Sequence, residues 1–189
     1  MLIIGITGTL GAGKGTIVEY LTDHKGFKHF SVRAFLIVEI KKRGLIVNRD
    51  TMTRVANELR AQNSPSYIVD CLFEKAVASG ENCVIESIRT PGEIDSLRNK
   101  GRFILLAVDA DAAIRYERVV LRNSETDRIS FDTFIDNEQR EMNSDDPNKQ
   151  NLHTCIQQAD YVFSNNGTLD ELTLQVEKVL REIENHGRR

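Results

Sequence analysis

The chain has 189 residues, of which 40% are hydrophobic and 28% are charged, and its formal net charge is −3. This length and composition are typical of one soluble globular domain spanning residues 1–189. The slight negative charge and the absence of Trp argue against a general nucleic-acid-binding surface, so we expect no nucleic-acid partner. Without an apolar run of about 20 residues or a basic, cleavable N-terminal segment, we expect no membrane partner and a cytoplasmic protein. Its three cysteines are widely spaced and form no C-x-x-C pair, as is usual in a reducing compartment.

The first predicted elements are a strand and a glycine-rich loop. Residues 2–6 (LIIGI) are apolar and largely β-branched, which predicts a buried strand. Gly8, four further residues and then Gly13 and Lys14 match the P-loop pattern up to its lysine. An amphipathic helix is predicted from there on. Backbone N–H groups, a helix N-terminus and one ammonium can together surround a phosphate. The predicted nucleotide-binding residues are Gly8, Gly11, Ala12, Gly13, Lys14, Gly15 and Thr16.

Three other interpretations of this loop fit the sequence less well. A plain strand-to-helix turn has no use for four glycines and a lysine. A dinucleotide-binding loop would need G-x-G-x-x-G, which is absent here. A protein-kinase glycine loop would be followed by H-R-D and D-F-G motifs, which are also absent. Gly15 stands where Ser or Thr usually follows the lysine, so Thr16 would supply the hydroxyl for phosphate or magnesium.

The middle of the chain predicts alternating helices and strands. Residues 26–31 indicate a short strand, and helices are expected over 33–43 and 50–62. Ser64 and Pro65 suggest an N-cap and a first helical position, opening a helix that ends near Gly80. A strand over 82–86 is followed by Thr90 and Glu93, which have the spacing of a capping box at the start of another helix.

The last third continues this alternation. Residues 103–109 form the longest apolar run and predict a central strand, followed by helices over 111–123 and 130–143. Residues 161–163 indicate the last strand. Thr168 and Glu171 form a second capping box, opening a final helix whose apolar positions are spaced as a core-facing stripe. Five strands alternating with helices favour an α/β fold with a parallel sheet.

Two acids stand at the carboxyl ends of predicted strands, the edge at which parallel sheets bind ligands. Glu86 and Asp109 are therefore candidate magnesium ligands together with Thr16, and Glu86 is also a candidate catalytic residue. A helix N-cap is an equally good interpretation of Asp109. Arg89 follows Glu86 closely and could clamp an acceptor's phosphate, with a surface salt bridge as the alternative.

Two further groups of arginines could contact phosphates. Arg115, Arg118 and Arg122 share one helical stripe, with Arg128 beyond, and form either a solvated basic face or a lid over the triphosphate. Arg118 and Arg122 are the candidates for catalysis. Arg33, Arg54 and Arg60 could line an acceptor pocket, with a pair between Arg54 and Glu58 as the alternative.

Three segments carry a family resemblance. Residues 11–16 resemble the loop of adenylate kinase-like nucleoside monophosphate kinases, and residues 84–90 are similar to the strand-end acid and phosphate-binding arginine of that superfamily. Residues 159–168 resemble the end of dephospho-coenzyme A kinases, in which the loop after the last strand lies against the adenine of ATP. This likeness implies that Asn166 and Gly167 bind the nucleotide.

The resemblance implies a three-layer α/β/α P-loop fold with a five-stranded parallel sheet. It also implies a helical acceptor-binding region at about 32–80, which would contain Arg33 and Arg60, and a short lid at about 122–133 without structural zinc. ATP and Mg²⁺ would be the cofactors. The partner would be a nucleotide-like small molecule, and the protein a monomer or homodimer.

One departure from the family concerns the acceptor. These kinases usually carry an aspartate just after the second strand and an arginine in the following turn, where this chain has Ala34 and Ile37. The first hypothesis is an ATP-dependent small-molecule kinase that transfers the γ-phosphate to a (deoxy)nucleoside monophosphate. A dephospho-coenzyme A kinase-like enzyme, a nucleotide-binding module without transfer activity and a slow NTPase with a macromolecular partner are the alternatives.

Overall fold

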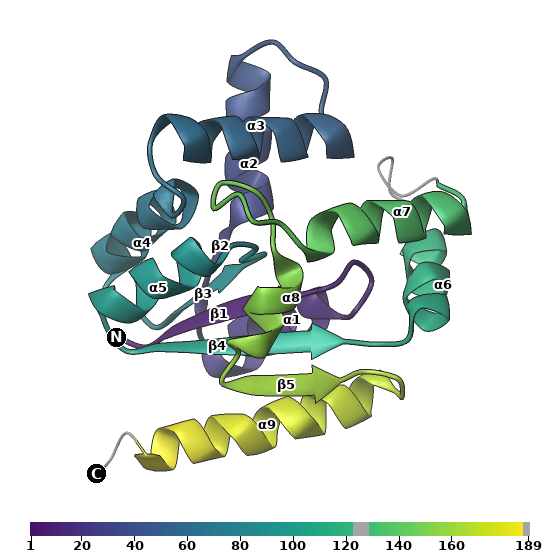
Figure 1. Cartoon of the computed structure of the whole chain (residues 1–189). Coiled ribbons are helices and arrows are strands. Elements are labelled where there is room, and N and C mark those ends of the chain that lie inside the picture. The colour runs from purple at the N-terminus through teal and green to yellow at the C-terminus, as the bar shows by residue number, and fades with distance from the viewer. Residues whose placement is uncertain (123–128, 187–189) are drawn as a thin grey trace.

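The computed structural model describes residues 1–122 and 129–186, and its centre is a parallel sheet (Figure 1). The strands lie in the order β2-β3-β1-β4-β5. Their bounds are β1 Ile3–Gly8, β2 Lys28–Ser31, β3 Cys83–Glu86, β4 Phe103–Asp109 and β5 Tyr161–Ser164. All four pairings are parallel, so the carboxyl ends of the strands meet at one edge of the sheet.

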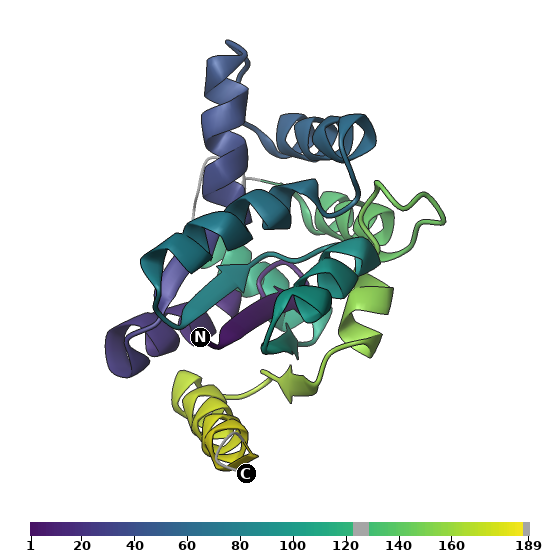
Figure 2. The same cartoon turned by 90° about the vertical axis from the view of Figure 1, so that its left-hand side faces the viewer.

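Helices cover both faces of the sheet, as a parallel sheet requires (Figures 1 and 2). Alternate strand residues point to opposite faces. Ile3 and Ile85 belong to one core with helices α2–α5 and α8, whereas Ile4 and Val84 belong to a second core with α1 and α9. The helices are α1 Lys14–Lys25, α2 Val32–Lys42, α3 Arg49–Gln62, α4 Tyr67–Ser79, α5 Pro91–Lys100, α6 Ala112–Arg122, α7 Phe131–Met142, α8 Leu152–Gln157 and α9 Leu169–His186.

The α6–α7 pair forms a separate layer beyond the carboxyl end of β4 (Figure 1). Its helices pack through aromatic rings, since Tyr116 has its centroid 5.2 Å from that of Phe131 and 5.6 Å from that of Phe134. Figure 1 shows α2 standing upright above the sheet with α3 lying across it, and Arg49 of α3 contacts Glu141 of α7. The α6–α7 pair and the α2–α3 pair therefore meet near the edge where the strands end.

The predicted fold class, a five-stranded parallel α/β sheet of the P-loop kinase type, is confirmed. Both capping boxes are present, at Thr90 and at Thr168. One helix start was wrong: α4 begins at Tyr67 with Ser66 as N-cap, because the carbonyl of Ser64 accepts from the N–H of Tyr67 in a preceding turn. The short helix α8 was not predicted, since six residues carry too little periodicity to identify it.

Half of the expected lid at about 122–133, residues 123–128 including Arg128, lies outside the described part of the chain, and its last three residues form the start of α7. In the described ranges, no helix combines the length and apolarity that crossing a membrane would require.

Candidate functional site

The P-loop connects β1 to α1 and has glycines where the backbone needs them. Gly8, Gly11 and Gly13 have φ values of 136°, 78° and 108°, a range that other residues adopt at a cost. The loop is also closely wrapped by its neighbours. A Cβ on Gly11 would lie 2.4 Å from the carbonyl oxygen of Arg115, and one on Gly13 would lie 2.4 Å from Nδ2 of Asn165.

Replacing Gly8 with alanine is expected to destabilise the fold more than the same change at Gly15. The Cβ at position 8 would lie 2.0 Å from the carbonyl oxygen of Val108 at a φ of 136°, and the backbone strain alone costs roughly 1–3 kcal/mol. Gly15 is the matched control, because a Cβ there meets no atom within 4 Å. Urea unfolding measures both variants. Equal free energies of unfolding would contradict this account of the loop.

Lys14, the first residue of α1, folds back onto the loop. Its Nζ donates to the carbonyl oxygens of Gly8 at 2.9 Å and Thr9 at 2.7 Å. Burial lowers the pKa of Lys14 to about 7, and the nearby Arg89 guanidinium adds to this effect. The charge of a bound phosphate would favour the ammonium form, so this lysine is suited to pair with an anion.

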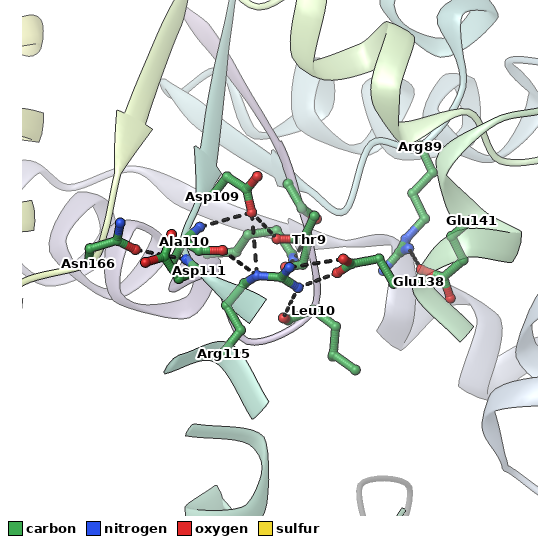
Figure 3. Close-up of polar contacts among 12 residues, drawn as sticks. Thr9, Leu10, Arg89, Asp109, Ala110, Asp111, Arg115, Glu138, Glu141 and Asn166 are labelled. Atoms are coloured by element: carbon green, nitrogen blue, oxygen red, sulfur yellow. Dashed lines mark hydrogen bonds and ion pairs between the residues drawn. The ribbon is translucent and has the colours of Figure 1, made fainter. Parts of the chain in front are cut away.

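The loop is braced from outside by β4, α6 and α7 (Figure 3). Oγ1 of Thr9 donates to Oδ1 of Asp109 at 2.5 Å. Arg115 donates from Nε to the carbonyl of Ala110 at 2.6 Å and from Nη1 to that of Leu10 at 3.3 Å, and its guanidinium also pairs with the carboxylate of Glu138. The side chain of Arg115 is only 5% exposed, so this residue holds the P-loop in place and does not belong to a lid as the helical stripe suggested.

A cavity of about 580 Å³ opens beside the loop and runs between α3 and the end of α6. It brings together most of the predicted site residues, namely Gly11, Gly13, Lys14, Gly15, Thr16, Arg33, Arg60, Glu86, Arg89, Arg118 and Arg122. Within the described ranges, the predicted residues that do not line it are Gly8, Ala12, Arg54, Asp109, Arg115, Asn166 and Gly167.

Asp109, a predicted magnesium ligand, lies next to the loop and outside the cavity lining. Its carboxylate accepts from Thr9 and from the backbone N–H of Ala110, and it lies 3.5 Å from Nε of Arg115. These contacts, all at Oδ1, tie Asp109 to the loop and to Arg115, and Asp109 is not among the residues that line the cavity. Thr16 and Glu86 are the predicted ligands that remain on the wall of the cavity.

The turn after β5 also differs in detail from the expectation. Asn165, not Asn166, lines the cavity, and its Nδ2 donates to the carbonyl of Ala12 at 2.8 Å. Asn166 accepts from the N–H of Asp111 instead. Arg118 is fixed on this turn by the carbonyls of Asn165 at 2.9 Å and Gly167 at 3.3 Å, so it reaches the cavity in a defined place.

Glu86 ends β3 and is held from the neighbouring strand. Oγ of Ser31 donates to its Oε1 at 2.8 Å, and Nε2 of His29 lies 3.5 Å away. Burial alone would raise the pKa of Glu86, but these hydrogen bonds and the charge of Lys14 outweigh it and keep the pKa below its usual range. Next to it, Ser87 has a φ of 67° and is the only non-glycine residue of the described chain in that region, a strain often found at functional sites.

Arg89 lies in an ion-pair cluster that sequence reasoning missed. Its Nη1 donates to Oε2 of Glu141 at 2.6 Å and to Oε1 of Gln150 at 2.8 Å. The other oxygen of Glu141 accepts from Nη2 of Arg49 at 2.6 Å. Arg49, Glu141 and Gln150 all line the cavity, and each comes from a different part of the chain.

Arg60 sits at the inner end of the cavity and is only 1% exposed. Its Nη2 donates at 2.8 Å to Oε1 of Glu93, which is fully buried, and the other oxygen of Glu93 accepts from the backbone N–H groups of Arg89 and Thr90. Nη1 of Arg60 has no hydrogen-bond partner in the described part of the protein. Arg54, by contrast, is exposed, pairs with Glu58 and is not part of the cavity wall.

The loop fits a nucleotide's phosphates, because its glycine cradle and the buried Lys14 meet on one cavity. Across residues 1–122 and 129–186, no three His, Cys, Asp or Glu side chains are grouped to hold a metal ion by themselves. Thr16 and Glu86 could complete a magnesium site only together with phosphate oxygens or water. Cys83 and Cys155 are buried in the core and far from thiolate character, since burial raises the pKa of both thiols.

Comparisons with known proteins agree with this geometry. A family model described as an AAA domain matches residues 4–144. A UPF0200 protein of Methanococcus vannielii is 31% identical over 187 residues, covering 97% of both chains. Among solved structures, a gluconokinase from Sinorhizobium meliloti 1021 is similar with a TM-score of 0.62 and 15% identity, covering 97% of this chain and 94% of the other.

A shikimate kinase from Bacteroides thetaiotaomicron is similar with a TM-score of 0.56 and 15% identity, covering 95% of this chain and 98% of that one. At such identities these structures establish the fold alone. The chain thus belongs to this AAA domain family, together with the UPF0200 proteins, and has the fold of the P-loop nucleotide and nucleoside kinase-like superfamily.

Proposed function

We propose that this protein is an ATP-dependent kinase that transfers the γ-phosphate to a nucleotide-like small molecule. The first candidate for this acceptor is a (deoxy)nucleoside monophosphate. One observation carries the proposal: a single cavity holds the P-loop lysine, Lys14, together with a second cationic group around Arg89. Phosphoryl transfer depends mainly on positioning and on neutralising charge, which two separate cationic groups on one cavity supply.

The donor side is assigned to the P-loop. Its N–H groups and Lys14 would hold the β- and γ-phosphates, and Thr16 and Glu86 would hold Mg²⁺, which neutralises phosphate charge when bound. Arg118 and Arg122, which line the cavity beside the loop, would stabilise the charge of the transferring group. The protein would act as a cytoplasmic monomer or homodimer.

The acceptor side is assigned to Arg33, Arg60 and Arg89. Between these arginines the cavity has an apolar wall that suits the flat face of a base, formed by Val32, Leu36, Met52 and Ala56. Dephospho-coenzyme A is the second candidate acceptor. The observation in its favour is the place of Glu86 on the cavity wall, where its ionised carboxylate could accept the proton of a ribose hydroxyl, although its lowered pKa makes it a weaker base than an ordinary glutamate.

A screen of ADP release tests the proposal. The acceptors are the common nucleoside and deoxynucleoside monophosphates and dephospho-coenzyme A, each with ATP and Mg²⁺. We expect turnover at about 1–100 s⁻¹ with members of one class. Tight nucleotide binding without turnover on any acceptor would instead support the alternative of a nucleotide-binding module, and hydrolysis without an acceptor would support a slow NTPase.

Arg89→Ala is expected to weaken binding of the acceptor more than binding of ATP. Loss of a hydrogen bond to a charged group costs roughly 1.5–3 kcal/mol, so the KM of the acceptor should rise about 10- to 100-fold while that of ATP changes little. The matched control is Arg54→Ala, which removes an exposed arginine of α3 outside the cavity. Equal losses for both substrates in Arg89→Ala would remove Arg89 from the acceptor side.

A further inference from the structure

The contact of Glu141 with two arginines is unusual for a surface helix. Glu141 is the penultimate residue of α7, yet its side chain is only 9% exposed and forms part of the cavity wall. Each of its two oxygens accepts from one guanidinium at 2.6 Å, Oε1 from Arg49 and Oε2 from Arg89 (the latter pair in Figure 3). A planar oxyanion bound from both sides is the geometry with which arginines recognise carboxylate and phosphate ligands.

The position of this carboxylate is unfavourable apart from the arginines. The carbonyl end of a helix carries partial negative charge, so an acid in the last turn of α7 is destabilised by its own helix. Burial would also raise the pKa of Glu141, but the guanidiniums of Arg89 and Arg49 outweigh it and keep the pKa low. The two arginines thus keep the carboxylate ionised, against the effects of its own helix and of burial.

Arg49 and Arg89 have their negative partner on a different element, α7. Arg49 opens α3 and Arg89 follows β3, and Glu141 is the one acid with which either forms a salt bridge in the described chain. Arg89 has one more contact with a neutral group, Oε1 of Gln150. An oxyanion entering beside an intact Glu141 would meet a like charge, whereas one that takes its place would keep both guanidiniums paired.

We propose that Arg49 and Arg89 form an oxyanion subsite of the acceptor and that Glu141 is its resident counter-ion, which the acceptor's phosphate or carboxylate group replaces. This inference rests on the proposed function, because it assigns the same cavity to an acceptor. It adds Arg49 and Glu141 to the site and predicts that acceptors bear a terminal oxyanion. The Glu141 side chain would then turn out of the arginine pair whenever an acceptor is bound.

Binding of small anions tests the exchange directly. Inorganic phosphate and acetate are titrated by calorimetry into full-length protein carrying Lys14→Ala, which removes the P-loop ammonium; the N–H groups of the loop are the same in every variant compared. Adding Glu141→Gln is expected to tighten binding of at least one anion by about 10-fold, because the amide competes more weakly for the arginines. The anion that gains more identifies the acceptor's group. Glu58→Gln, which neutralises another acid paired with arginines, is the matched control and should change nothing.

Unchanged or weaker anion binding after Glu141→Gln would overturn the proposal. It would also be overturned if the tighter anion binding persisted when Arg49→Ala was added. Wild-type crystals soaked in phosphate give a second measurement that needs no variant. An anion between Arg49 and Arg89 with Glu141 turned away supports the proposal, and Glu141 still paired with both arginines overturns it. Neither measurement uses ATP. The kinase proposal can therefore fail in the ADP-release screen while the anion measurements support the subsite, and the subsite can fail while the screen supports the kinase proposal.

Discussion

Lys14→Ala should lower the rate of phosphoryl transfer by about 10²–10³-fold, equivalent to roughly 3–4 kcal/mol, the scale measured when one preorganised electrostatic donor is removed. The ammonium is the only full positive charge on the P-loop itself, and it lies at the loop carbonyls of Gly8 and Thr9. In the buried cavity its interaction with phosphate is screened less than at a surface. The measurement is kcat/KM for the acceptor identified by the ADP-release screen.

The control for this change is Lys25→Ala, at the other end of the same helix. Lys25 lies over the ring of Tyr20, with Nζ 5.6 Å from the centroid, and is remote from the cavity lining. Its loss should leave kcat/KM within about twofold, because it touches neither substrate. Near-normal activity of Lys14→Ala, with Lys25→Ala equally active, would contradict the role given to the P-loop lysine.

Local patterns in the sequence were enough to predict the fold. The strands appear as short apolar runs, both capping boxes depend on residues three positions apart, and the P-loop pattern from Gly8 to Lys14 spans seven consecutive residues. Each of these features acts through a turn or a single helix end, so a sequence window contains all the partners. These patterns predicted five parallel strands without their order, and the order β2-β3-β1-β4-β5 comes from the structure.

The site could be predicted only in part, because its contacts join distant segments. Arg49 and Glu141 are 92 residues apart. Glu141 shares the buried face of α7 with Phe134 and Asn137, but helical spacing does not identify the arginines that it meets there. The arginine stripe on α6 predicted a shared helix face correctly, yet periodicity does not say what that face packs against. Arg115 turned out to hold the P-loop, whereas Arg118 reaches the cavity.

The same limit applies to Asp109, which periodicity places at a strand end without saying which groups surround it. Its partners Thr9 and Arg115 come from the P-loop and from α6, so only the folded chain shows that its Oδ1 is engaged with the loop and its brace. A residue at the ligand edge of a parallel sheet can either bind the ligand or support the loop that does. In this protein Glu86 is the acid on the cavity wall, and Asp109 is the acid beneath the loop.

Glu93→Gln is expected to cost about 3–5 kcal/mol of folding free energy, the usual effect of removing one partner from a buried ion pair. Glu93 and Arg60 are 0% and 1% exposed, so the guanidinium would be left in the core without its counter-charge. The new amide has one oxygen where the carboxylate has two, so its NH2 group would face either the Arg60 guanidinium or the backbone N–H groups of Arg89 and Thr90, which now donate to Oε2. Urea unfolding measures the loss.

Two comparisons show whether the buried pair is the cause. Glu58→Gln removes an acid from exposed pairs with Arg43 and Arg54 and should cost less than about 1 kcal/mol. Adding Arg60→Met to Glu93→Gln should recover part of the lost stability, since it removes the unpaired charge. A Glu93→Gln protein as stable as Glu58→Gln would show that the pair does not hold α3 to α5. Because Glu93 also fixes the backbone of Arg89, the unstable variant should lose acceptor binding at temperatures where it is still folded.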